Sequence, residues 1–246
     1  MKIVIVNNYK VSEQKVIANR FEPLIDAGIK RGIKFSYIGP RDVSSISKNN
    51  IEKIDLDLHD TQTDNFFLRA YLEIKNCIKL VIEAKKLHAD LYLFTIPSMF
   101  LLPSSLFFSS KSIVDIRDLT WEYLPKKKIY SRFLKFFMDL SIKKSKKILV
   151  SNQAEFKYVK NLNSNVISMS NGISINKFNE LSMIPSYDSQ PINVTYIGNI
   201  GVAQNLKVLL NVASERPKVI FNIVGNGTQY NELKNYAINL GSVFQK

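Results

Sequence analysis

A glycine-rich strand–helix–strand pattern between residues 192 and 227 constrains the fold of this 246-residue chain more than any other feature. An alternating apolar run, INVTYI, ends in a turn that holds Gly198 and Gly201, and a helical pattern follows directly. A second apolar run, VIFNIV, ends in a turn that holds Gly225 and Gly227. A βαβ unit puts both turns side by side at the carboxyl edge of a parallel sheet, where phosphates bind free N–H groups. The pattern predicts a nucleotide-diphosphate site; the alternative is that the first glycine pair only makes a tight strand-to-helix turn.

Strand and helix patterns alternate through the residues before this unit. Strands are expected within, or at the start of, seven segments: 1–9, 33–40, 51–60, 91–96, 111–125, 148–161 and 164–178. Helices are expected in 11–32, 64–90, 126–147 and the later part of 148–161. Such alternation is typical of an α/β fold with a parallel sheet. We predict a complete Rossmann-like domain over 1–178, a polar linker with two prolines over 179–191, and an incomplete second Rossmann-like domain over 192–246.

Positive charge is concentrated in one part of the chain. The net charge is +13, and residues 111–150 hold eleven Lys/Arg against four acidic residues, a net +7. Such a segment attracts anionic lipid, nucleic acid or a phosphorylated substrate, or it is simply a solvated basic face. The helix expected over 126–147 is apolar on most sides, so it either lies in a membrane interface or is buried in the core. The nearly uncharged stretch 91–108 is broken by Pro97 and Pro103, which argues against a membrane span.

A charged, aromatic loop, IRDLTWE, follows the strand in 111–125. Arg117 can hold a phosphate, the carboxylates of Asp118 and Glu122 can handle a proton, and Trp121 can stack on a sugar ring. We therefore expect an acceptor or catalytic loop at the sheet edge, with a salt-bridged surface loop as the alternative.

The sequence does not predict a metal site, a dinucleotide site or a reactive cysteine. The two histidines have no Cys or His neighbours at metal-ligand spacing, and the triplet Asp55-Leu56-Asp57 is explained by strand alternation, so no metal site is expected. Gly225-Asn226-Gly227 resembles part of a dinucleotide fingerprint, but Tyr230 stands where the third glycine would be, which argues against a nicotinamide or flavin cofactor. Cys77, the one cysteine, lies in a helical pattern and is expected to be a buried structural thiol.

The motifs together resemble those of bacterial family-4 glycosyltransferases, within them the amino-deoxyhexose transferases of O-antigen and capsule synthesis (the L-fucosamine transferase type). The resemblance covers LYLFTIPSMF, VDIRDLTWEYLP, ILVSNQAEFKYV and SNGISINKF, and it is most specific in YIGNIGVAQNLKVLL and FNIVGNGTQYNELKNYA. It implies a GT-B architecture of two Rossmann-like domains. It also implies transfer of a sugar with retention at the anomeric carbon, usually without a metal or another cofactor, from a nucleotide-sugar donor that is a substrate.

The resemblance also implies roles for particular residues. The second domain would bind the donor diphosphate, and the first would bind a lipid-linked sugar acceptor at the cytoplasmic face of the inner membrane. Catalysis is expected from Asp118 and Glu122 and acceptor binding from Arg117 and Trp121, whereas the donor diphosphate is expected to contact Gly198, Asn199, Gly201, Gln204, Gly225 and Gly227.

The chain departs from the family pattern at two places. Val202 stands where the family has a basic residue, and no counterpart of the later E-x7-E glutamate pair is present. We therefore expect little or no transferase activity from this chain alone, and a separately encoded C-terminal half as a candidate partner.

Two other classes of function compete with the transferase hypothesis. The first is a non-catalytic membrane- or polyanion-binding protein that uses the basic segment 111–150. The second, a nucleic-acid binder, is disfavoured because the lysines lie near apolar helix faces without a stacking platform. The expected location is cytoplasmic and peripheral to the inner membrane, held to the inner-leaflet surface by the basic segment 126–147.

Overall fold

The computed structural model describes residues 1–10, 15–41, 51–61, 63, 65–96, 98–125, 127–172, 178–180 and 192–241. The chain divides into two compact units, residues 1–177 (unit 1) and 178–246 (unit 2). Most of the predicted linker, from 181 to 191, lies outside the described residues.

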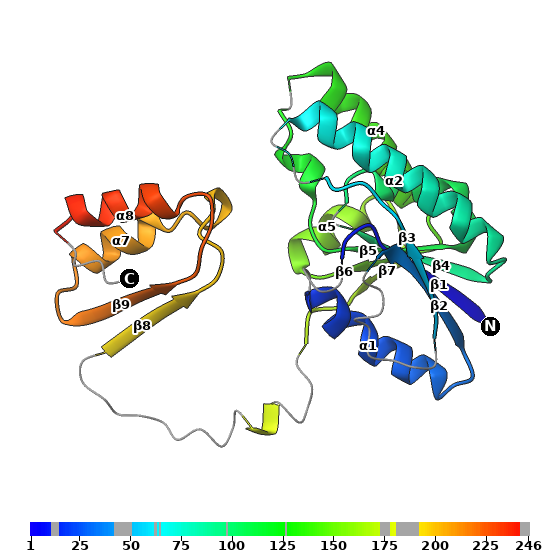
Figure 1. The fold of residues 1–246 in the computed structure, drawn as a ribbon, viewed down its shortest axis with the longest axis horizontal. Coiled ribbons are helices and arrows are strands. Elements are labelled where there is room, and N and C mark those ends of the chain that lie inside the picture. Colours follow the sequence, from blue (N-terminus) through cyan, green and yellow to red (C-terminus); the bar gives the residue numbers. More distant parts are fainter. Residues whose placement is uncertain are drawn as a thin grey trace. The chain divides into compact units, whose positions relative to one another are not determined.

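Unit 1 is built on a seven-stranded parallel sheet (Figure 1). Its strand order is β3-β2-β1-β4-β5-β6-β7, so the direction in which strands are added reverses between β1 and β4. Ligands of open α/β sheets bind at such a switch point, outside the carboxyl ends of the strands. The strands are β1 (Lys2–Val6), β2 (Lys34–Pro40), β3 (Glu52–Leu56), β4 (Leu91–Ile96), β5 (Ser112–Ile116), β6 (Lys147–Val150) and β7 (Val166–Ser168).

Helices cover both faces of this sheet, as the near-continuous apolar runs of the central strands require. Alternate residues of β1 point to opposite faces: Val4 and Val6 belong to one core cluster, and Ile5 belongs to the other. The Val4 cluster contains side chains of α2 (Phe66–Lys86), α3 (Leu101–Ser104), α4 (Ile129–Lys144) and α5 (Gln153–Lys160). The Ile5 cluster contains side chains of α1 (Lys15–Ile29).

Local signals set the ends of the long helix α2. The Asn65 side chain accepts hydrogen bonds from the N–H groups of Phe67 and Leu68, which makes it the N-cap. After the helix, His88 has a φ of 44°, a left-handed conformation that stops the helix before the expected end at residue 90.

Helix α4 is shorter than the predicted 126–147 and buries only part of its apolar surface. Met138 and Ile142 are buried in the core, whereas Phe133 and Phe136 are exposed. Among the described residues, no helix combines the length and the apolar character that crossing a bilayer would require.

Unit 2 contains the predicted βαβ pattern. Strands β8 (Ile192–Ile197) and β9 (Val219–Val224) pair in parallel, and helices α7 (Lys207–Ser214) and α8 (Tyr230–Asn239) pack on them. The fully buried core of the unit consists of Ile200, Leu206, Leu210, Leu233 and Ala237.

The prediction that a helix begins directly after Gly201 is wrong. A single 3₁₀ turn, η5 (Val202–Gln204), comes first, and Asn205 then adopts a left-handed conformation with φ 45°. Asparagine tolerates this conformation better than most residues, so it interrupts the helical pattern, and α7 begins only at Lys207.

Candidate functional site

The two glycine turns of unit 2 lie against each other, as predicted. The N–H of Gly198 donates to the carbonyl of Val224 (3.0 Å), and the N–H of Ile200 donates to the carbonyl of Asn226 (2.8 Å). The N–H of Gln229 returns a bond to the carbonyl of Ile200 (3.0 Å). The turns thus extend the parallel pairing of β8 and β9 beyond the strands and form one polar backbone surface.

This close approach requires glycine in the second turn. Gly225 and Gly227 have φ values of 154° and 159°, which side-chain-bearing residues rarely adopt. A Cβ atom on Gly225 would collide with the carbonyl oxygen of Gly198, and one on Gly227 would collide with that of Ile200.

Two amide side chains border the first turn. A Cβ placed on Gly201 would lie 2.9 Å from Asn199 Nδ2 and 3.0 Å from Gln204 Oε1, so both side chains flank this glycine. The Tyr196 hydroxyl donates to the Asn199 carbonyl (2.8 Å) and holds the turn. All six residues predicted to contact a donor diphosphate therefore gather at the carboxyl ends of β8 and β9.

The unpaired backbone donors of this site belong to the turn and not to a long helix. No acceptor is present among the described residues for the N–H groups of Asn199, Gly201 and Val202. We expected the N-terminus of the helix to follow the glycines directly. Instead, η5 and Asn205 separate the turn from α7. Free backbone donors and amide groups around a glycine turn suit a phosphate.

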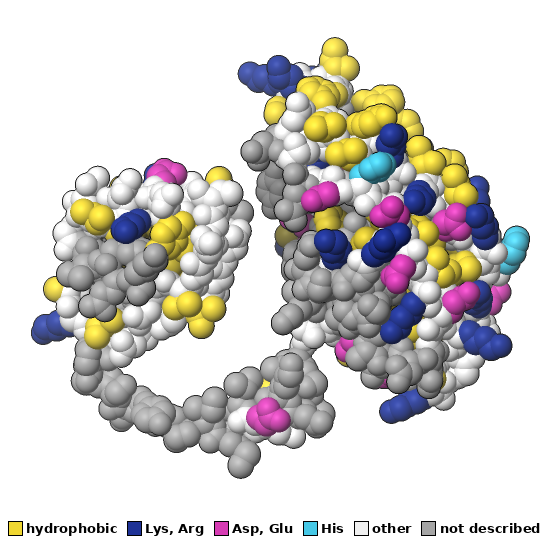
Figure 2. All heavy atoms as spheres, viewed as in Figure 1, with side chains coloured by type: hydrophobic (Ala, Val, Ile, Leu, Met, Phe, Trp, Pro, Cys, Tyr) yellow, Lys and Arg dark blue, Asp and Glu magenta, His cyan; other side chains and the backbone are white. Residues whose placement is uncertain are grey.

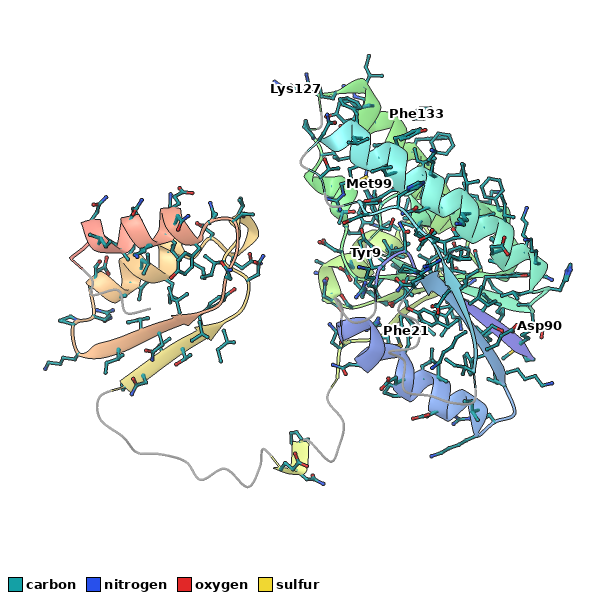
Figure 3. All side chains as sticks on the ribbon, viewed as in Figure 1. Tyr9, Phe21, Asp90, Met99, Lys127 and Phe133 are labelled. Carbon is teal, nitrogen blue, oxygen red and sulfur yellow. The ribbon has the colours of Figure 1, made fainter. Side chains whose placement is uncertain are left out.

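Unit 1 has a polar group at its switch point that the sequence interpretation missed. The loop after β1 begins with Asn7, whose Nδ2 donates to the Tyr37 hydroxyl (2.7 Å) and whose Oδ1 accepts from the Thr95 hydroxyl (2.9 Å). Asn7 therefore joins the ends of β1, β2 and β4. Figure 3 labels Tyr9, two residues further along this loop.

A chain of hydrogen bonds runs from this loop to α2. Asn8 Nδ2 donates to Ser98 Oγ (3.1 Å), Ser98 Oγ donates to Glu73 (3.0 Å), and Arg69 Nε donates to the same carboxylate (3.0 Å). Burial and the Glu73 carboxylate raise the pKa of the Tyr9 phenol. The Oδ1 of Asn8 is buried and has no hydrogen-bond partner among the described residues.

A buried ion pair lies next to this group. The Arg20 guanidinium of α1 donates to both carboxylate oxygens of Asp115, with distances of 2.6–3.0 Å, and also to the carbonyl of Met169. Arg117, at the end of β5, donates from Nε to the carbonyl of Ile96 (3.2 Å). Burial lowers the pKa of Arg117, the Asp115 carboxylate opposes that shift, and the Arg20 guanidinium adds to it.

The residues of the predicted acceptor loop have different positions. Arg117 joins the switch-point group, and Asp118 is half-buried between β5 and the 3₁₀ turn η4 (Thr120–Tyr123). Trp121 is only 3% exposed, so the structure gives its indole a packing position and not the expected stacking position on a sugar. Glu122 accepts a hydrogen bond from Lys135 Nζ and is held at the start of α4.

The switch-point residues had two signals that sequence reasoning could have used. Asn7, Asn8 and Tyr9 directly follow a buried strand, which is where switch-point ligands bind. Glu73 lies on the same face of α2 as the buried residue Cys77, and a carboxylate among core positions is unusual.

No group of three or more His, Cys, Asp or Glu side chains within the described part of the chain is placed to hold a metal ion.

Solved structures with a similar fold share little of this sequence. Sucrose-phosphate synthase from Thermosynechococcus elongatus matches with a TM-score of 0.64 at 11% identity, over 100% of this chain and 71% of that chain. The Anabaena protein HepE in complex with UDP-glucose matches with a TM-score of 0.62 at 14% identity, over 98% of this chain and 66% of that chain. Trehalose-6-phosphate synthase, OtsA, matches with a TM-score of 0.63 at 9% identity, over 98% of this chain and 69% of that chain.

Neither a protein-family model nor a curated protein matches the sequence of the chain. The chain spans about two thirds of the length of the three solved structures, between 66% and 71%. Those structures have the GT-B fold, and the chain therefore has an α/β fold of GT-B type, with a Rossmann-like unit 1 and a partial Rossmann-like unit 2.

Proposed function

We propose that the chain serves in glycosyl transfer from a nucleotide-sugar donor to a lipid-linked glycan acceptor, as in the synthesis of O-antigen or capsule polysaccharide. The observation that carries this proposal is the contact between the two glycine turns of unit 2, flanked by Asn199 and Gln204. Support comes from the fold shared with HepE, whose structure was solved in complex with UDP-glucose.

The proposed roles follow from the chemistry of each group. The N–H groups of Asn199 and Gly201 and the two amide side chains would bind the donor diphosphate and stabilise the charge that develops as it leaves. In unit 1, Arg117 would bind an anionic group of the acceptor, and Asp118 and Glu122 are the proposed catalytic carboxylates. Trp121 would support this loop by packing beneath it. Transfer would proceed with retention, and the nucleotide sugar would be a substrate in a reaction that uses no separate cofactor.

A lipid-linked acceptor would require the protein to work at a membrane surface. The proposed location is the cytoplasmic face of the inner membrane, where the basic segment 126–147 would contact anionic lipid headgroups. Each lysine or arginine near such a surface contributes about 1 kcal/mol of attraction.

Calorimetric titration with UDP, GDP and dTDP sugars tests the donor site. We expect one nucleotide class to bind, and the double variant Asn199→Ala/Gln204→Ala to weaken its binding about tenfold or more, because hydrogen bonds to charged groups contribute about 1.5–3 kcal/mol each.

The matched control is Asn235→Ala/Asn239→Ala, which removes two exposed amides of α8 in the same unit and should bind as the unaltered protein does. If no nucleotide sugar binds, or if the Asn199/Gln204 variant binds as tightly as the control, the assigned donor site is wrong. The unaltered chain incubated with the bound donor and lipid-extracted acceptors then tests transfer itself.

A further inference from the structure

Helix α2 has two apolar faces, and unit 1 buries only one of them. Cys77, Leu80 and Ala84 face the core, whereas a second row of large apolar side chains on the same helix is exposed. The exposed row is spaced at intervals of three and four residues, the spacing of a single helical stripe. It consists of Phe67, Tyr71, Ile74, Ile78 and Ile82.

Helix α4 adds a second exposed row next to the first. Ile129, Phe133 and Phe136 have the same spacing and are 84%, 63% and 60% exposed. The rings of Phe67 on α2 and Tyr130 on α4 pack edge to face with centroids 6.3 Å apart, which joins the beginnings of the two helices.

Phe107 extends the surface at the other end of α2, where Lys85 Nζ lies 5.3 Å from its ring centroid. We call this continuous surface the apolar strip: the five α2 residues, the three α4 residues and Phe107. From Phe67 to Ile82 it extends about 22 Å along α2, at 1.5 Å per residue. Figure 2 shows hydrophobic side chains gathered along this side of unit 1, and Figure 3 labels Phe133 and Lys127 there.

The exposed charges of the two helices that carry the apolar strip are positive. Lys75, Lys79 and Lys86 are exposed on α2, and Lys127, Lys128 and Arg132 are exposed at the start of α4. The acidic side chains of the two helices are withdrawn: Glu73 and Asp139 accept internal hydrogen bonds, and Glu83, the most exposed of the three, is 29% exposed and pairs with Lys86.

We propose that the apolar strip inserts into the interface of a lipid bilayer that contains anionic phospholipid, with the surrounding lysines at the level of the phosphates. Aromatic and aliphatic residues flanked by lysine are the composition of helices that lie in a membrane interface. Protein interfaces, in contrast, are depleted in lysine. A symmetric contact between two copies would also bring the same basic margins together.

This inference deepens the membrane association in the proposed function, which rested on the charge of 126–147 alone. It assigns the contact to two helices, includes α2, and makes apolar insertion the main source of affinity. Its test does not depend on donor binding or transfer, so the two proposals can fail separately.

Sedimentation with phosphatidylcholine vesicles that contain about 30% phosphatidylglycerol tests the inference. The variants Phe67→Ser/Tyr71→Ser/Ile78→Ser and Ile129→Ser/Phe133→Ser/Phe136→Ser should each lower the partition coefficient about 100-fold, because every large apolar side chain left in water costs several-fold in affinity. The matched control is Val208→Ser/Val212→Ser/Ile238→Ser, which removes three exposed apolar side chains of unit 2 and should bind as the unaltered protein does.

Charge and insertion can be separated with salt and with a local probe. Binding should persist in part at about 1 M salt, where the Debye length falls to about 3 Å. An added tryptophan, Phe133→Trp, should shift its emission to the blue and be quenched by brominated lipid, over the constant signal of the buried Trp121.

Two results would overturn the inference. In the first, both strip variants, folded as judged by circular dichroism, still bind vesicles while Lys127→Gln/Lys128→Gln/Arg132→Gln does not, so that charge alone holds the protein. In the second, the unaltered protein is a dimer without lipid and the strip variants are monomers, so that the strip is an interface between copies.

Discussion

Gly225 shows most directly how single residues hold the candidate donor site together. Its φ of 154° and the carbonyl oxygen of Gly198 leave no room for a side chain. In Gly225→Ala, the added methyl would force the two turns apart, and we expect the free energy of unfolding of unit 2 to fall by about 2–3 kcal/mol. Urea titration followed by far-UV circular dichroism measures the loss, and nucleotide-sugar affinity should fall with it.

Gly241 provides a matched control for this substitution. It also has a positive φ, 74°, but a Cβ there would meet nothing within 4 Å. Gly241→Ala should therefore cost only the backbone penalty of about 1–2 kcal/mol and leave nucleotide-sugar affinity unchanged. Equal losses of affinity in the two variants would show that the contact between the turns does not matter for binding.

Cys77 gives a prediction for the pH dependence of stability. Burial on the core face of α2 raises the pKa of its thiol from the ordinary value near 9 to about 12. Above pH 9 the unfolded chain loses this proton while the folded chain keeps it, so stability falls as the pH rises.

Between pH 8 and pH 10 this thiol alone should lower the free energy of unfolding by about 1.4 kcal/mol. The difference in urea stability between the unaltered protein and Cys77→Ala, measured at both pH values, isolates that contribution. A difference that stays constant from pH 8 to pH 10 would contradict the burial of the thiol.

At the scale of elements, the strands were predicted better from sequence than the ends of the helices, since α2 and α4 are shorter than expected and α7 begins later. The central strands of unit 1 are buried on both faces, so they read as apolar runs, and β4 has the predicted bounds Leu91–Ile96. The helix after Gly201 failed because an apolar pattern at helical spacing continues through Asn205, which the structure places in a left-handed conformation. Backbone conformation at a single asparagine has no signature in hydrophobic spacing.

The candidate sites of the two units also differed in how far the sequence could predict them. The donor-side residues lie within two turns of one βαβ unit, so sequence spacing brought them together. The switch-point group pairs residues far apart in the sequence, such as Arg20 and Asp115, which are 95 positions apart. Only the order of strands in the sheet places them next to each other, and local pattern does not determine that order.

Asn205 tests whether the break between η5 and α7 is built into the sequence. A β-branched residue tolerates the left-handed conformation poorly, so Asn205→Val should cost unit 2 about 1–2 kcal/mol, whereas Asn205→Gly should be nearly neutral. Urea titration by circular dichroism distinguishes them. A stabilising effect of Asn205→Val would contradict the left-handed conformation of Asn205 and indicate that α7 extends back towards Gly201 in solution.

At the scale of the whole molecule, the two units differ greatly in what holds them together. Unit 1 has a seven-stranded sheet with core clusters on both faces. In the described part of unit 2, two strands carry helices over one face, while Ile197, Ile220 and Val224 on the other face are exposed. Two-stranded sheets are marginally stable without further packing, so unit 2 should unfold under milder conditions than unit 1.

The single tryptophan makes the two transitions separable. Trp121 is buried in unit 1, so its fluorescence follows unit 1 alone, whereas far-UV circular dichroism follows both units. We expect urea to produce a first transition by circular dichroism that leaves Trp121 fluorescence unchanged, and a second transition seen by both signals.

A bound nucleotide sugar should act on the first of these transitions only. At a concentration about 100 times its Kd, the ligand should stabilise unit 2 by about 2.7 kcal/mol, because it binds the folded unit and not the unfolded chain. The Trp121 transition should not move, since the glycine turns belong to unit 2. If the two transitions coincided, the two units would not unfold separately. If the ligand shifted only the Trp121 transition, the nucleotide would bind unit 1, at the group around Asn8 and Arg117.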